Sequence, residues 1–106
     1  MYYLSNSKVN LSIYLDEYYD NDSVMIWVDD KIVFQEKGVT TDFSTSLAAQ
    51  FTTSVEEKKI KILCEVPTRN LSASKTLNVK GEVHLRVSIL NGILRIIEEK
   101  APPIFF

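Results

Sequence analysis

The segment Val-His-Leu-Arg-Val-Ser-Ile-Leu-Asn-Gly-Ile-Leu-Arg-Ile-Ile-Glu, residues 83–98, decides the fold class. Apolar and polar side chains alternate along it, as they do in strands that bury one face. Asn91-Gly92 is the preferred two-residue connection of a β-hairpin, because both residues adopt positive φ angles readily. This turn sets Ile89 opposite Leu94 on the apolar face. We therefore predict a hairpin over Val83–Glu98.

The same period-two alternation recurs upstream, around residues 8–15, 24–28, 32–34, 43–55, 59–66 and 71–79. Polar or glycine-containing turns separate these segments every eight to twelve residues or so, which is typical of a two-sheet sandwich or a small barrel. No convincing amphipathic helix interrupts them. We predict an all-β fold of about seven or eight short strands, in a two-sheet antiparallel sandwich that is immunoglobulin-like or related.

Two local alternatives affect the predicted faces. A two-residue turn at Asp29-Asp30 pairs Trp27 with Ile32, whereas a three-residue turn pairs Val28 with Ile32. We favour the second, because it collects one clean apolar face. That face holds Val24, Ile26, Val28, Ile32 and Phe34, and it leaves Met25, Trp27 and Val33 on the other side. Further on, Phe43 begins a predicted strand, although Ser46–Gln50 also suits a short helical turn.

Length and composition are those of one globular domain, residues 1–106, with residues 1–7 and 101–106 as candidate extended tails. The net charge of −2 argues against a domain built to bind nucleic acid. The N-terminus lacks a basic and apolar leader, and no apolar run is long enough to span a membrane. We therefore expect no membrane partner, and slightly favour the cytoplasm while leaving the localisation open.

Catalytic and metal-binding patterns are lacking. His84 is the one histidine and is expected to face solvent, and Cys64 alternates in phase with buried isoleucines, so we expect an unreactive, buried thiol. Residues 1–30 hold one lysine against six acidic residues, a net −5, which indicates a solvated loop or an acidic face for a basic partner or a cation. The spacing of Asp16, Glu17, Asp20, Asn21 and Asp22 matches no known calcium loop. We expect no enzyme, cofactor or tight metal site.

Exposed aromatic and apolar side chains are the remaining signal. Met25, Trp27, Val33 and Tyr14 are predicted to form an outward patch, and the tail Ile104-Phe105-Phe106 is strongly apolar. We predict a non-enzymatic module that binds another protein or a second copy of itself, as a small inhibitor or accessory subunit does. The alternative is a carbohydrate-binding module that uses its Tyr and Trp surface.

Overall fold

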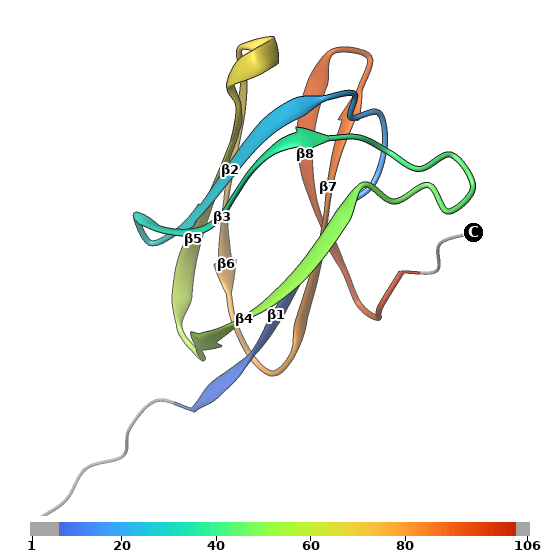
Figure 1. Ribbon diagram of the computed structural model, residues 1–106. Helices are drawn as coiled ribbons and strands as arrows, with labels where there is room; N and C mark the ends of the chain where they lie inside the picture. The colour runs from blue at the N-terminus through green and yellow to red at the C-terminus, as the bar shows by residue number, and fades with distance from the viewer. Residues whose placement is uncertain (1–6, 104–106) are drawn as a thin grey trace, which may run out of the picture.

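The protein is a sandwich of two four-stranded β-sheets (Figure 1). The computed structural model describes residues 7–103. Sheet A has the order β4 (Ala49–Glu56), β1 (Lys8–Leu15), β7 (Val83–Leu90), β8 (Ile93–Glu99). Sheet B has the order β3 (Lys31–Val39), β2 (Asp22–Val28), β5 (Lys59–Val66), β6 (Leu71–Asn78). A short 3-10 helix, η1 (Pro67–Arg69), joins β5 to β6. No helix in residues 7–103 is long and apolar enough to cross a membrane.

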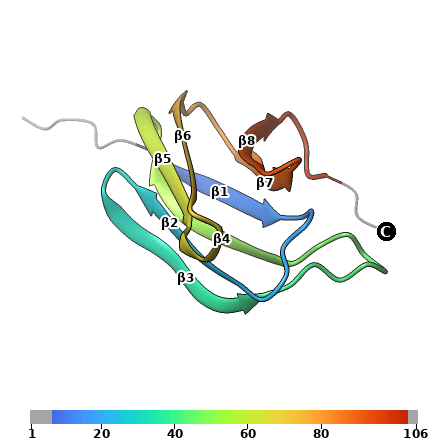
Figure 2. The same ribbon diagram turned by 90° about the horizontal axis from the view of Figure 1, so that it is seen from above.

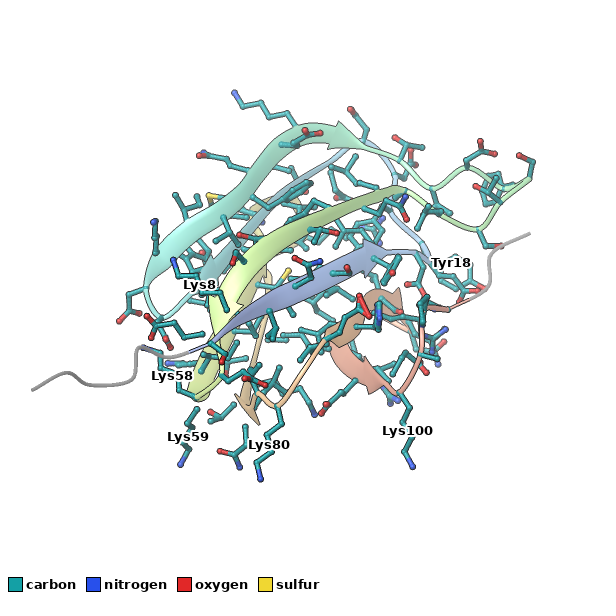
Figure 3. The ribbon with its side chains drawn as sticks, turned by 90° about the horizontal axis from the view of Figure 1, so that it is seen from below. Lys8, Tyr18, Lys58, Lys59, Lys80 and Lys100 are labelled. Atoms are coloured by element: carbon teal, nitrogen blue, oxygen red, sulfur yellow. The ribbon has the colours of Figure 1, made fainter. Side chains whose placement is uncertain are left out.

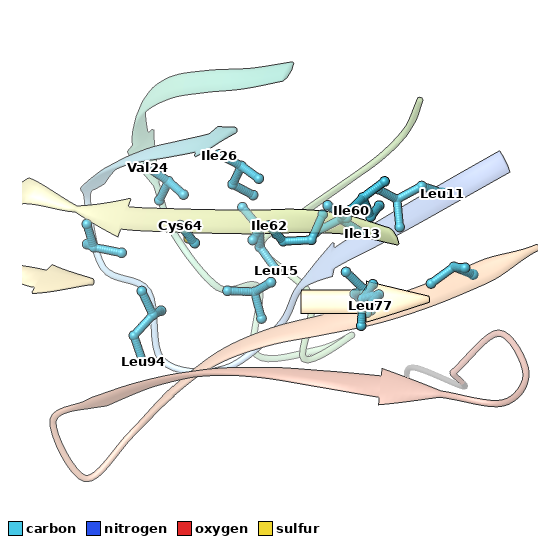
Figure 4. Close-up of a cluster of buried hydrophobic side chains, with 14 of the residues drawn as sticks. Leu11, Ile13, Leu15, Val24, Ile26, Ile60, Ile62, Cys64, Leu77 and Leu94 are labelled. Atoms are coloured by element: carbon cyan, nitrogen blue, oxygen red, sulfur yellow. The ribbon is translucent and has the colours of Figure 1, made fainter. Parts of the chain in front are cut away.

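The core lies between the two sheets, which face each other in Figure 2. Each central strand contributes alternate apolar side chains to it, as the period of the sequence requires. The fully buried set, several of whose members are labelled in Figure 4, includes Leu11, Ile13 and Leu15 of β1, Val24 and Ile26 of β2, Ile60, Ile62 and Cys64 of β5, and Leu85, Val87 and Ile89 of β7. The predicted two-sheet sandwich is thus confirmed.

The β7–β8 hairpin forms as predicted. Asn91 and Gly92 have φ angles of 53° and 74°, the positive values that a type I′ turn requires. Ile89 pairs with Leu94, and Val87 pairs with Ile96. Turn chemistry and apolar pattern specify the same register here, so the sequence is sufficient to predict it.

The β2–β3 hairpin differs from the favoured register. The turn contains two residues, Asp29 and Asp30, both at positive φ, and Trp27 pairs with Ile32. A β-bulge then shifts the ladder, so that Ile26 still pairs with Phe34. Because the bulge adds one residue to β3, Ile32 lies outside and is 43% exposed. For the same reason Val33, predicted to face outward, packs against the core.

Phe43 does not begin a strand. Residues 42–47 form a loop closed by a bridge between Asp42 and Leu47, and β4 starts at Ala49. The Asp42 side chain accepts hydrogen bonds from the backbone and the hydroxyl of Ser44, so this aspartate stabilises a turn in place of a ladder. The period-two pattern continues through the loop by coincidence.

One strand pairing is parallel. β1 runs antiparallel to β4 but parallel to β7, with Ile13 opposite Leu85. The other described strand pairs are antiparallel. Alternation along a strand is the same for both directions, so the sequence pattern does not reveal this pair. The immunoglobulin-like arrangement stays a prediction.

Candidate binding surface

Several connections meet at one end of the sandwich, which we call the loop end. It comprises the β1–β2 loop (residues 16–21), the β3–β4 loop (residues 40–48), η1 and the β7–β8 turn (Figure 1). The β1–β2 loop lies at its centre and bonds to each neighbour. The Ile89 amide donates to the Glu17 carbonyl, and the Arg69 Nη2 donates to the Tyr18 carbonyl at 2.8 Å.

Thr41 joins the β3–β4 loop to the β1–β2 loop. Its hydroxyl accepts from the Tyr19 amide at 3.0 Å and donates to the Asp16 carbonyl at 2.6 Å. Its own amide donates to the Tyr19 carbonyl. Thr41 is buried, and so is Tyr19, whose hydroxyl donates to the Val87 carbonyl at 2.6 Å. Burial raises the pKa of Tyr19, so this donor keeps its proton at ordinary pH. The two loops are therefore held in one arrangement.

Asp22 joins the β1–β2 loop to η1. Its buried carboxylate accepts from the Thr68 hydroxyl at 2.6 Å and from Arg69, whose Nη2 lies 2.9 Å from Oδ2. Burial alone opposes ionisation, but the hydrogen bonds from the Asp20 amide, Thr68 and Arg69 outweigh it and lower the pKa of Asp22. Asp22 therefore has a structural role and is not part of a free acidic surface.

Two aromatic side chains project from this framework. Phe43 is 88% exposed, more than any other large apolar side chain of residues 7–103, and Tyr18 is 53% exposed. Both line a cleft of about 220 Å³, together with Tyr19, Asp20 and Thr40. Tyr18 also has a φ of 97°, a strained value for a bulky residue. Such strain persists only where the surrounding contacts enforce it, and it is often found at functional sites.

Charge is distributed unevenly between the two ends. Glu17, Asp20 and Asp42 are exposed at the loop end, and hydrogen bonds from the Ser44 side chain and backbone lower the pKa of Asp42. At the other end, a cleft of about 540 Å³ is lined by residues that include Lys58, Lys59 and Lys80, opposite Tyr18 in Figure 3. Lys58 forms ion pairs with Asp29 and Glu56 there. Glu57 lines the same cleft, so acidic and basic side chains are mixed there, whereas the exposed Glu17, Asp20 and Asp42 of the loop end are all acidic.

The predicted patch on sheet B is partly assembled. Trp27 and Met25 are half-buried and stand outside the core cluster, and Trp27 pairs with Ile32 on β3 and with Leu63 on β5. These four residues form an apolar row on the outer face of sheet B. Val33 does not join it, because the bulge turns this side chain to the core.

Tyr14 lies on the other sheet, away from Trp27. It projects from the outer face of sheet A, where its hydroxyl lies 3.1 Å from His84 Nδ1 and the two rings stack. His84 is buried, contrary to the solvent-facing position that we predict, because β7 is an interior strand with Tyr14 over the ring and Glu82 3.5 Å from Nε2. The tail Ile104-Phe105-Phe106 falls outside the described residues.

The β1–β2 loop, which carries the clustered acidic residues of the sequence, is bonded to the sandwich. Asp16 is buried, accepts from the Ser88 hydroxyl, and lies 3.5 Å from Arg86, which also pairs with Glu99 at 2.9 Å. Within residues 7–103, no three His, Cys, Asp or Glu side chains are grouped to hold a metal ion.

Cys64 is buried as predicted, and burial, with the nearby charge of Glu65, raises its pKa to about 12.

The sequence alone does not predict a site at the loop end. Phe43 is expected to begin a strand, and neither Tyr18 nor Thr41 lies in a motif with a known function. The Asp42-Phe43-Ser44 sequence was the available clue, since an aspartate two residues before a serine favours a local turn. No known protein family matches the chain, and no curated protein is significantly similar to it.

Proposed function

We propose that the protein is a non-enzymatic binding module, and that the loop end makes contact with another protein. The observation that carries the proposal is the exposure of Phe43 beside Tyr18 at the rim of one cleft. Aromatic side chains are enriched at protein interfaces, because they bury a large area while few rotatable bonds are fixed. Two exposed aromatic side chains at the rim of one cleft therefore support a contact surface there.

The rigidity of the loops supports the same proposal. Ordering flexible loops on binding costs free energy, and loops that are already ordered avoid that cost. Here Thr41 and Asp22 fix the β1–β2 loop to the β3–β4 loop and to η1 through buried and partly buried hydrogen bonds. A scaffold that holds exposed aromatic side chains in place is typical of binding loops on a β-sandwich.

Site-specific photo-crosslinking tests the contact. A benzophenone amino acid at position 43 keeps an aromatic ring and captures whatever lies against it. The same amino acid at position 74, on the outer face of sheet B, and at position 80, at the opposite end, gives matched controls. We expect one adduct from position 43 that is absent at position 80. An adduct formed at position 74 alone would move the contact to sheet B.

Tyr18→Gly separates binding from folding. Glycine adopts a φ of 97° without strain, so this variant should fold at least as stably as the wild type, with about 1 kcal/mol gained. It should also lose the position-43 adduct, because half of the aromatic rim is gone. Unchanged capture by Tyr18→Gly would contradict the proposal, and unfolding cannot be invoked for a variant that is more stable.

A carbohydrate-binding module is the alternative, since exposed aromatic rings also stack on sugars and Asp20 and Thr40 offer polar groups beside them. A glycan array with wild type and Phe43→Ala distinguishes the two. Selective binding of one glycan that Phe43→Ala abolishes would replace a protein partner with a carbohydrate. The apolar row on sheet B is the second proposed contact, for another copy of the chain.

A further inference from the structure

The cleft at the loop end combines aromatic and acidic groups. Tyr18, Tyr19, Asp20, Thr40 and Phe43 line it, and all of these residues except Tyr19 are exposed. At about 220 Å³ the cleft is smaller than most pockets for drug-sized ligands, which span about 300–1,000 Å³. It is therefore suited to a single side chain of a larger partner.

The charges around the cleft select the sign of that side chain. The Asp20 amide bonds to Asp22, but the Asp20 carboxylate has no hydrogen bond or ion pair with the described residues. Glu17 and Asp42 are exposed in the same two loops. The nearby cation, Arg69, is held by Asp22 and by the Tyr18 carbonyl. A cation entering the cleft thus meets uncompensated negative charge.

We propose that this cleft accepts a lysine or arginine side chain from the partner protein, between the Tyr18 and Phe43 rings and beside the Asp20 carboxylate. This inference rests on the proposed function of the loop end. The negative face of an aromatic ring attracts a cation, and Tyr and Phe rings are both used in this way. The carboxylate adds an ionic contact with the same group. The partner is accordingly a protein with an exposed basic segment.

Peptide titration of the whole protein tests the inference. The probe is a capped tetra-arginine peptide, and the matched control is the same peptide with citrulline, which has nearly the same shape and no charge. We expect the arginine peptide to shift amide resonances of residues 17–20 and 40–43, and the citrulline peptide to leave them unchanged. Added salt should weaken the binding. Equal binding of both peptides would overturn the role of charge.

Paired variants identify the groups that recognise the cation. Phe43→Leu keeps an apolar side chain but removes the ring face, and Asp20→Asn keeps the shape but removes the charge. Each should weaken arginine-peptide binding by about three- to tenfold, in line with exposed cation–π and ion-pair contacts. Asp30→Asn, which removes an exposed carboxylate from the β2–β3 turn at the opposite end, should change nothing. Normal binding by both Phe43→Leu and Asp20→Asn would refute the inference.

The outcomes also separate this inference from the proposed function. One outcome is that the position-43 crosslink forms in the wild type and is lost in Tyr18→Gly while the arginine peptide fails to bind. In that case the loop end is a contact surface, and the assignment of a cationic ligand to its cleft is wrong. If neither the crosslink nor the peptide binding is observed, the proposed function itself is wrong. If the peptide binds but shifts residues outside 17–20 and 40–43, the basic segment binds elsewhere and the assignment to this cleft is refuted.

Discussion

Replacing Thr41 by valine should destabilise the protein far more than a surface substitution does. Valine matches threonine in shape but lacks the hydroxyl, so the Tyr19 amide loses its acceptor and the Asp16 carbonyl loses its donor. Each buried polar group left without a partner costs about 1–3 kcal/mol. Thr41→Val should therefore lower the free energy of unfolding by about 3 kcal/mol, a large part of the 5–15 kcal/mol or so typical of a domain.

Thr41→Ser is the matched control, because it keeps both hydrogen bonds and removes one methyl group, at a cost of about 1 kcal/mol. Urea unfolding followed by circular dichroism gives both free energies, and the dependence on urea should be the same for the two variants. Hydrogen exchange at the Tyr19 amide should accelerate in Thr41→Val alone. If the two variants lose equal stability, the hydroxyl does not hold the loops together, and the preorganised loop end is incorrect.

Three further predictions concern other parts of the fold. Cys64 should react slowly with a thiol reagent in the native state and quickly in denaturant, since burial raises its pKa to about 12; rapid native labelling would contradict this. The pKa of Asp22 is lowered by folding, so its contribution to stability is complete above the unfolded value of about 4 and is lost as the pH falls below it. Unfolding measured from about pH 5 to pH 2 should show a shallower acid loss in Asp22→Asn than in wild type, and parallel curves would exclude this role. Trp27→Ala should stay folded, and in sedimentation velocity it should weaken self-association more than tenfold, since a central tryptophan contributes about 2 kcal/mol or more to a contact. An unfolded mutant would instead show that Trp27 stabilises the core.

Local chemistry determined how much of the fold the sequence predicts. Asn91-Gly92 and its flanking alternation specify one register, and the structure has that register. At Asp29-Asp30 the pattern favoured a three-residue turn, because that turn pairs Ile26 with Phe34 without any irregularity. In the structure a two-residue turn is followed by a β-bulge, and the bulge restores the pairing of Ile26 with Phe34. Nothing in a period-two pattern signals a bulge, so the outward face was predicted with Val33 in place of Ile32.

The candidate site was less predictable, because it depends on which loops meet. Phe43 and Tyr18 are far apart in the sequence, and contacts through Thr40 and Thr41 bring their loops together. The burial of His84 was not predictable for the same reason, since it too depends on which distant segments meet. Its outward register was predicted, but its burial depends on the Tyr14 ring, which belongs to a strand that pairs with β7 from the other end of the sequence.

The parallel pairing of β1 with β7 determines when the protein can fold. β1 begins at Lys8, whereas its neighbour β7 in sheet A begins at Val83. Sheet A therefore cannot be completed until residues 83–90 have left the ribosome, and contacts of such long sequence separation form slowly, within about milliseconds to seconds. Until then, one edge of β1 lacks its partner and is available for pairing with other nascent chains. A chain ending at Asn78 would retain this open edge permanently, and should aggregate in place of folding.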